Sequence, residues 1–158
     1  MDFQRIKLDL LALGLLALTV FAGLSLASYD SADPPAKNVF PSRVRANNLC
    51  GLYGAELAHH LRTGVGIGAY FALVSLVVAG VRLFRRSAVT DWSLCTVGVL
   101  FSLAGLCVAL QLLLPGLGDG PMIGSGGYLG TLGLTWLEGH FSTVGTIVLC
   151  GTVFLAGL

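Results

Sequence analysis

The charged residues of this 158-residue chain leave long gaps, and these gaps limit what it can fold into more than any other feature. Leu10 to Ser28 and Trp92 to Gly118 contain no Lys, Arg, Asp or Glu. A bilayer core about 30 Å thick needs roughly 20 apolar residues in a helix that rises about 1.5 Å per residue. The gaps are therefore long enough to be membrane spans.

Composition supports the same conclusion. Only 11% of the residues are charged, whereas a soluble domain has roughly 25%. Four apolar stretches reach or approach the length of a span: Leu8–Ala27, Gly64–Phe84, Trp92–Leu114 and Phe141–Leu158. Asp9 and Arg82 are the charges inside them, each within a turn of an end where a side chain can reach the headgroups. We predict an all-α polytopic membrane protein with four transmembrane helices.

An alternative makes the first span a cleaved signal peptide. Arg5 and Lys7 precede the apolar run, and Ser25, Leu26 and Ala27 offer small residues at positions suited to cleavage. The run is longer than the apolar region that is usual for such a peptide, which is about 7–15 residues. Retention of the span as a membrane anchor is therefore favoured.

Orientation follows from the basic residues that lie closest to a span. Arg85 and Arg86 border the short loop 85–91, the position where the positive-inside rule has most weight. This loop is predicted to be cytoplasmic, and loops 28–63 and 115–140 external. Both termini then lie in the cytoplasm.

The external loops contain two short helical patterns. Leu49, Leu52, Tyr53 and Leu57 recur at helical spacing before span two, and Leu129, Leu132, Trp136 and Leu137 do so before span four. Both patterns predict short interfacial helices. Gly51-Leu-Tyr-Gly54 matches Gly127-Tyr-Leu-Gly130 at an offset of 76 residues, which suggests an internal repeat of a short helix followed by a span.

Small residues recur every four positions within the spans, which is typical of close helix packing in lipid. The stripes are Thr19, Gly23 and Ala27; Gly64, Gly68 and Ala72; Gly98 and Ser102; and Gly139 and Thr143. Packing within one chain is the favoured interpretation, and contacts between chains are the alternative.

The residues that could support chemistry are few. The four cysteines form no C-x-x-C pair, and the chain has no P-loop motif. Asp30 and Asp33 are interpreted as a turn in which Asp side chains bond backbone amides, rather than as a cation site. His59, His60 and His140 are interpreted as interfacial polar residues, with haem or metal binding as the alternative. Gln111 is expected near the outer end of span three, within reach of water. We therefore assign no catalytic, cofactor-binding or metal-binding residue.

Three stretches, taken in order, resemble the N-terminal four-span domain of FtsK/SpoIIIE-type bacterial DNA translocases. The first is Leu26 to Pro34, in which Ser28-Tyr29-Asp30 and Asp33-Pro34 are the most specific residues. Asn48 to Ala58 and Gly68 to Arg86 follow, and the run around Gly126 to Gly130 resembles the approach to the fourth span of this family. The loop after Asp33-Pro34 departs from the family pattern, at Pro35 to Pro41, Arg43 and Arg45.

The resemblance implies a membrane anchor in the bacterial inner membrane that places an ATP-driven DNA pump at the division septum. It implies self-association as a hexamer, contacts with septal division proteins, and DNA binding only through a motor domain that lies outside this chain. The chain would then be a fragment of a longer translocase and would not itself be an enzyme. The candidate structural or interaction residues are Tyr29, Asp30, Asp33, Gly51, Gly54, Gly64, Gly68, Gly127, Gly130, Arg85 and Arg86.

Two alternatives to the anchor are kept. One is a small haem- or quinone-linked redox protein that uses the three histidines, and the other is an unrelated tetraspan scaffold.

Overall fold

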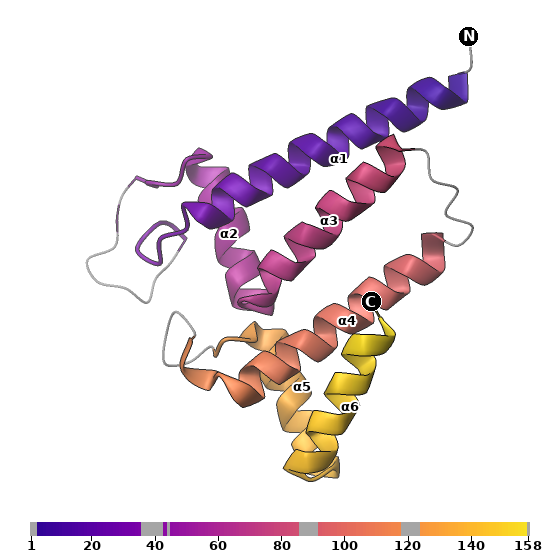
Figure 1. The fold of residues 1–158 in the computed structure, drawn as a ribbon. Coiled ribbons are helices and arrows are strands. Elements are labelled where there is room, and N and C mark those ends of the chain that lie inside the picture. The colour runs from indigo at the N-terminus through magenta and orange to yellow at the C-terminus, as the bar shows by residue number, and fades with distance from the viewer. Residues whose placement is uncertain (1–2, 36–42, 44, 86–91, 118–123, 158) are drawn as a thin grey trace. The chain divides into compact units, whose positions relative to one another are not determined.

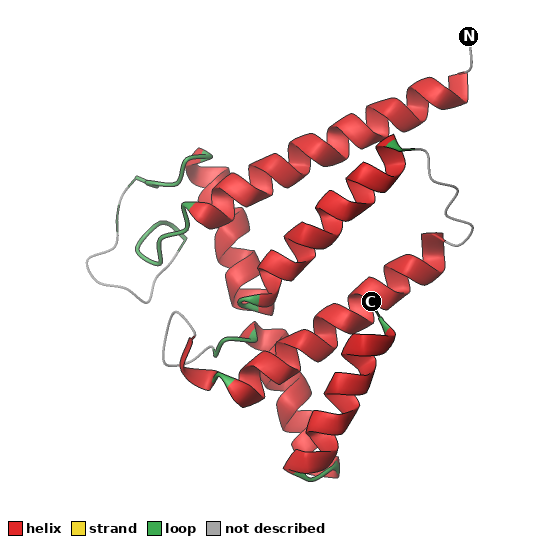
Figure 2. Cartoon of the chain, viewed as in Figure 1, coloured by secondary structure: helices red, strands yellow, loops and turns green. Residues whose placement is uncertain are grey.

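A computed structural model describes all residues except 1–2, 36–42, 44, 86–91, 118–123 and 158. Within the described residues the chain forms helices and no strand (Figure 2). In order (Figure 1), these are α1 Phe3–Ala27, α2 Gly51–Val65, α3 Gly68–Phe84, α4 Trp92–Leu113, a 3-10 turn Pro115–Leu117, α5 Gly127–His140 and α6 Thr143–Ala156. The predicted all-α class is confirmed.

The helices differ in their ability to cross a membrane. Ile6–Ala27 in α1 and Ser93–Leu113 in α4 are long and apolar enough to span a bilayer alone. Helices α2 and α3 pass the same test only as a pair, and they meet at a bend of 111°. Helix α6 is apolar but shorter. This set of helices is compatible with a four-span membrane protein.

The predicted second span, Gly64–Phe84, is not one straight helix. Gly64 and Val65 complete α2, the chain turns at Gly66 and Ile67, and α3 begins at Gly68. Gly66 has a φ of 60°, a left-handed conformation that glycine adopts readily. Mean hydropathy cannot reveal such a break, because the residues on both sides of it are apolar.

The chain divides into two compact units, Met1–His60 with Leu73–Val89, and Leu61–Ala72 with Thr90–Leu158. In the first unit, small residues of α1 make its buried face, with Ala12, Thr19 and Ala22 all nearly covered. A Cβ placed on Gly23 would lie 3.5 Å from Leu73 of α3. The predicted stripe therefore contributes to packing within the chain at Thr19 and Gly23, whereas Ala27 is exposed.

In the second unit, α4 packs against α5 and α6. A Cβ on Gly98 would lie 3.1 Å from the Gly157 carbonyl oxygen, and one on Gly105 would lie 3.0 Å from the Cys150 carbonyl oxygen. The Ser102 hydroxyl lies between these contacts and donates to the Phe154 carbonyl at 3.2 Å. The predicted Gly98 and Ser102 stripe is thus a helix contact within the chain, where small residues allow backbones to approach closely in lipid.

Helix α5 packs through a face that its apolar periodicity did not indicate. Gly127 and Gly130 are buried, whereas Leu132 and Trp136 of the predicted apolar face are 69% and 62% exposed. Gly130 faces α4 at Cys107, and Gly127 faces the backbone of Gly64 and Gly66. In a membrane this arrangement leaves the large apolar side chains available to lipid.

Candidate functional site

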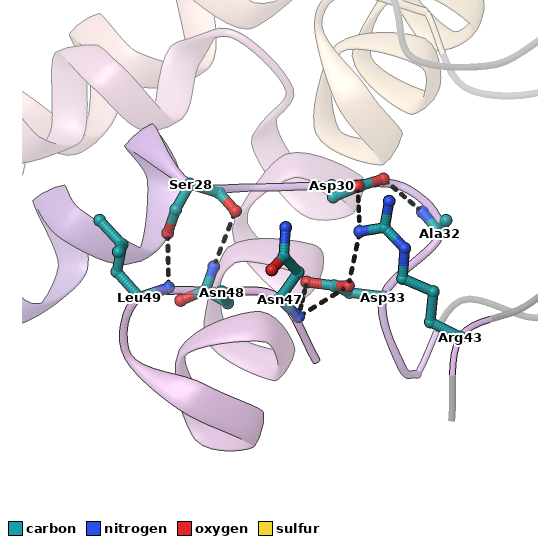
Figure 3. Close-up of polar contacts among 8 residues, drawn as sticks. All are labelled: Ser28, Asp30, Ala32, Asp33, Arg43, Asn47, Asn48 and Leu49. Atoms are coloured by element: carbon teal, nitrogen blue, oxygen red, sulfur yellow. Dashed lines mark hydrogen bonds and ion pairs between the residues drawn. The ribbon is translucent and has the colours of Figure 1, made fainter. Parts of the chain in front are cut away.

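The loop between α1 and α2 contains a cluster of polar contacts that we call the loop clasp, formed by Asp30, Asp33, Arg43 and Asn47 (Figure 3). The backbone N–H of Asn47 donates to both carboxylate oxygens of Asp33, each at 3.0 Å. Arg43 Nη1 lies 2.6 Å from Asp30 Oδ2 and 3.5 Å from Asp33 Oδ1. One guanidinium group therefore bridges two carboxylates of the turn that follows α1.

The two carboxylates of the loop clasp have different environments. The Asp33 side chain is only 2% exposed, so it depends on the Asn47 amide and on Arg43 for the interactions that water would otherwise provide. The Asp30 side chain is 34% exposed. The predicted turn is confirmed, since the Ala32 N–H donates to Asp30 Oδ1 at 2.9 Å.

The pKa of Asp30 is lowered from its ordinary value, mainly by the hydrogen bond from the Ala32 amide. Desolvation opposes this shift, and the charge and hydrogen bond of Arg43 add to it. A lowered carboxyl pKa means that the folded loop favours the ionised form. The resulting stabilisation is complete above the ordinary Asp pKa and is lost as the pH falls through the lowered pKa. The contribution of the ionised Asp30 carboxylate is therefore present in full at neutral pH.

Asn48 connects the end of α1 to the start of α2 (Figure 3). Its side-chain amide donates to the carbonyls of Ser25 at 2.8 Å and Ser28 at 3.3 Å, and its side-chain oxygen accepts the Cys50 N–H at 3.0 Å. The Leu49 N–H donates to the Ser28 hydroxyl at 3.1 Å. These bonds satisfy backbone groups that both helix ends leave without partners inside the helix.

The first turn of α2 lies against α1. A Cβ on Gly54 would lie 2.5 Å from Asn48 Oδ1 and 2.9 Å from Ser25 Oγ. Cys50 Sγ donates to the Phe21 carbonyl at 3.6 Å. Gly54 therefore permits a close approach that any larger residue would push apart.

An equivalent arrangement joins α4 to α5 in the second unit. Gln111 Oε1 accepts the Gly126 N–H at 3.2 Å, and the Ser125 hydroxyl donates to the Leu110 carbonyl at 2.7 Å. A Cβ on Gly130 would lie 2.5 Å from the Cys107 carbonyl oxygen. We expected water to satisfy the Gln111 side chain, but its oxygen instead accepts the Gly126 amide, just before α5. Amides at the start of a helix have no partner inside the helix, so a side-chain acceptor there is favourable.

A backbone hydrogen bond joins the bend between α2 and α3 to the segment that leads into α5. The Ile67 N–H donates to the Ser125 carbonyl at 2.8 Å. A Cβ on Gly127, whose φ is 63°, would lie 2.6 Å from the Gly66 nitrogen, and a Cβ on Gly66 would overlap the Ser125 carbonyl oxygen. We call this contact between Gly66–Ile67 and Ser125–Gly127 the glycine junction.

Cys107 of α4 adds a third segment to the glycine junction. Its thiol donates to the Val65 carbonyl at 3.4 Å, and a Cβ on Gly68 would lie 2.6 Å from its sulfur. Backbone and side-chain atoms therefore fill the positions that side chains on Gly66, Gly68 and Gly127 would occupy. The glycine junction is therefore a closely packed contact between backbone segments.

The two junctions share a plan that agrees with the predicted repeat. Each short helix begins at a glycine with positive φ, Gly51 at 68° and Gly127 at 63°. Each then places a second glycine, Gly54 or Gly130, against the preceding long helix. An amide side chain, Asn48 or Gln111, bonds the backbone where the two helices meet.

The remaining candidates are Tyr29, Gly64, Arg85 and Arg86, and of these the Gly64 carbonyl lies against Gly127 of the glycine junction. Tyr29 is half-buried and follows α1, Gly64 has no atom within 4 Å of its Cβ position, and Arg85 is exposed at the end of α3. Arg86 lies outside the described residues. The role of these residues in binding a partner stays a prediction.

Among the residues that the structure describes, no three His, Cys, Asp or Glu side chains lie close enough together to hold a metal ion. The His59 and His60 rings lie 5.9 Å apart, edge to face. His140 Nδ1 lies 2.8 Å from the Trp136 carbonyl oxygen.

Sequence reasoning gave no role to Arg43 and Asn47 of the loop clasp or to Gly66 of the glycine junction. Arg43 and Asn47 bond carboxylates 13 and 14 residues earlier in the chain, and no local pattern indicates such pairs. Gly66 is one of 22 glycines, so composition did not single it out.

Comparison with known families gives one match. Residues 4–158 match the family described as the 4TM region of DNA translocase FtsK/SpoIIIE. No curated protein and no solved structure matches the chain.

Proposed function

Because the chain belongs to the family of 4TM regions of FtsK/SpoIIIE DNA translocases, we propose that it anchors such a translocase in the bacterial inner membrane at the division septum. The family match over residues 4–158 is the observation that carries this proposal, and it makes the chain a membrane domain distinct from the ATPase motor. The apolar helices α1 and α4 support it, since each is long enough to cross a bilayer.

The proposed mechanism is positional. An anchor confines motor subunits and septal partners to the same small region of membrane, so that weak contacts suffice for assembly. We propose that the chain contributes no catalysis, and that DNA is contacted only through the motor. Self-association as a hexamer and contacts with septal division proteins belong to the same proposal.

The packing within the chain limits where self-association would occur. The face of α4 that carries Gly98, Ser102 and Gly105 is covered by α6 and the residue after it in the same chain. Contacts between copies would therefore use the exposed apolar surfaces of the helices, where side chains such as Leu10 and Leu94 are more than half exposed.

We also propose that both termini face the cytoplasm. The basic residues Arg82 and Arg85 at the end of α3 support this orientation, because positive charges beside a span favour the cytoplasmic side. Loops 28–63 and 115–140, including the loop clasp, would then face outward.

A fluorescent-protein fusion after Leu158 tests the location and the orientation together. We use a green fluorescent protein that fluoresces only in the cytoplasm, expressed in a dividing bacterium, with an unrelated four-span protein carrying the same reporter as the control. We expect fluorescence that is enriched at midcell, whereas the control labels the envelope evenly. Even labelling by the chain would contradict the septal role, and a dark but inserted fusion would contradict the orientation.

A further inference from the structure

Helix α5 begins beside residues of α4 that lie well inside the apolar span. Its Gly126 and Gly130 contact the Cys107 carbonyl, and a Cβ on Gly133 would lie 2.5 Å from Val108 Cγ2. Cys107 is about 9 Å inside the Leu113 end of α4 at the rise of an α-helix. The first turns of α5 therefore lie at the depth of spanning residues rather than beyond them.

Apolar residues continue on the far side of this contact. Leu113, Leu114 and Leu117 follow the contact residues along the chain, and all three are exposed. If the membrane surface lay at Cys107, these leucines would stand in water. The contact is thus placed below the headgroups of the leaflet that surrounds the Leu113 end of α4.

The composition of α5 suits such a depth. From Gly127 to Leu137 it has no charged residue, and its charge at Glu138 is confined to the last turn. The hydroxyls of Thr131 and Thr135 donate to the carbonyls four residues earlier, at 2.9 and 2.8 Å. Polar groups that are satisfied within the helix can be placed in lipid at low cost.

The exposed face of α5 is apolar, as are exposed side chains of the two helices that pack against it. Tyr128, Leu132 and Trp136 are each more than half exposed. Helix α5 packs against both α4 and α6, whose exposed apolar side chains include Leu113 and Val144. The same apolar surroundings therefore cover all three helices.

We propose that α5 is a re-entrant helix sunk into the leaflet at the Leu113 end of α4, and that acyl chains of lipid cover its face formed by Tyr128, Leu129, Leu132 and Trp136. The buried glycine face holds α5 against α4, and the opposite face replaces contacts with water by contacts with hydrocarbon. This inference goes beyond the septal role and does not depend on it.

Tryptophan fluorescence in vesicles measures this depth directly. The chain has two tryptophans, so a Trp92→Phe variant reports Trp136 alone. A second variant, Tyr128→Trp with both native tryptophans changed to Phe, reports the first turn of α5. The matched aqueous control is Arg45→Trp in the same background, because Arg45 is exposed in the loop before α2. Each protein is reconstituted in phosphatidylcholine vesicles with and without brominated acyl chains.

We expect bromine in the upper part of the acyl chain to remove about half of the emission at positions 136 and 128, and aqueous iodide on both sides of the membrane to change it little. The emission of the Arg45→Trp control should be quenched by iodide and changed little by the brominated acyl chains. Quenching of Trp136 by iodide to the extent seen in the control would overturn the proposal. Protection of Trp136 from both quenchers would also overturn it, because the face would then be covered by protein. Trp136 is native, so the test stands even if the Tyr128→Trp variant fails to fold.

Discussion

Replacing Gly66 with alanine is expected to destabilise the fold by about 3 kcal/mol or more, the largest effect of a single methyl group in this chain. Gly66 has a φ of 60°, which is unfavourable for an L side chain. The added Cβ would also overlap the Ser125 carbonyl oxygen, which is backbone and cannot rotate away. The glycine junction would have to open, with loss of the hydrogen bond from the Ile67 amide to Ser125.

The buried cysteines provide the measurement and Gly64 provides the control. Cys107 and Cys150 are nearly covered, so a dye that fluoresces on reaction with thiols reports unfolding in detergent as they become accessible. The exposed Cys95 and the half-buried Cys50 are first replaced with alanine. A Gly64→Ala variant, two residues away and with no atom within 4 Å of the new methyl group, should unfold at the temperature of the parent. Equal midpoint temperatures of unfolding for Gly66→Ala and Gly64→Ala would show that the close contact at Gly66 does not stabilise the protein.

Replacing Asp33 with alanine is expected to destabilise the loop between α1 and α2 by about 2 kcal/mol. The Asn47 amide would lose both carboxylate oxygens, and Arg43 would lose one of its two acidic partners. Because Asp33 is buried, the change also leaves a small void where a bonded carboxylate had been. Cys50 reports the effect, since it is half-buried beside Phe21 and should react faster with a thiol reagent when the loop opens.

Two further substitutions separate burial from charge at the loop clasp. Asp33→Asn keeps an oxygen that can accept the Asn47 amide, so we expect a smaller rise in the reactivity of Cys50. Asp30→Ala removes an exposed carboxylate, for which water can substitute, and should have the smallest effect of the three. If Asp30→Ala opened the loop more than Asp33→Ala, the central role that we give to Asp33 would be wrong.

The helices and their apolar character could be predicted because they depend on local composition. The charge gaps at Leu10 to Ser28 and Trp92 to Gly118 coincide with α1 and α4, the two helices that can span a bilayer alone. The pairs of glycines at Gly51 and Gly54, and at Gly127 and Gly130, marked the start of both short helices. In each case the signal lies within a few residues of the structure that it predicts.

The contacts between helices could not be predicted in the same way. The bend at Gly66 interrupts a stretch of continuous apolar residues, so hydropathy indicates one span there. The periodicity of α5 drew attention to Leu132 and Trp136, whereas the packed face consists of glycines that carry no hydrophobic signal. In lipid, large apolar side chains do not have to be buried against protein, so apolar periodicity loses the meaning that it has in a soluble helix.

The loop clasp shows the same limit for polar residues. The motif Ser28-Tyr29-Asp30 and Asp33-Pro34 indicated a turn, which the bond from Ala32 to Asp30 confirms. The loop clasp is completed by Arg43, at a position that departs from the family pattern, and by Asn47. The local turn residues therefore located the turn without showing which distant residues bond to it.

The most direct test of the anchoring role exchanges membrane domains on one motor. A FtsK/SpoIIIE-type motor domain is expressed with this chain in front of it, or with an unrelated four-span domain of the same orientation, in cells that lack their own translocase. We expect only the fusion with this chain to gather at midcell and to restore chromosome segregation, because both fusions bind the membrane and only one carries the positional information. Equal localisation and equal rescue by the two fusions would contradict the account, since any membrane attachment would then suffice.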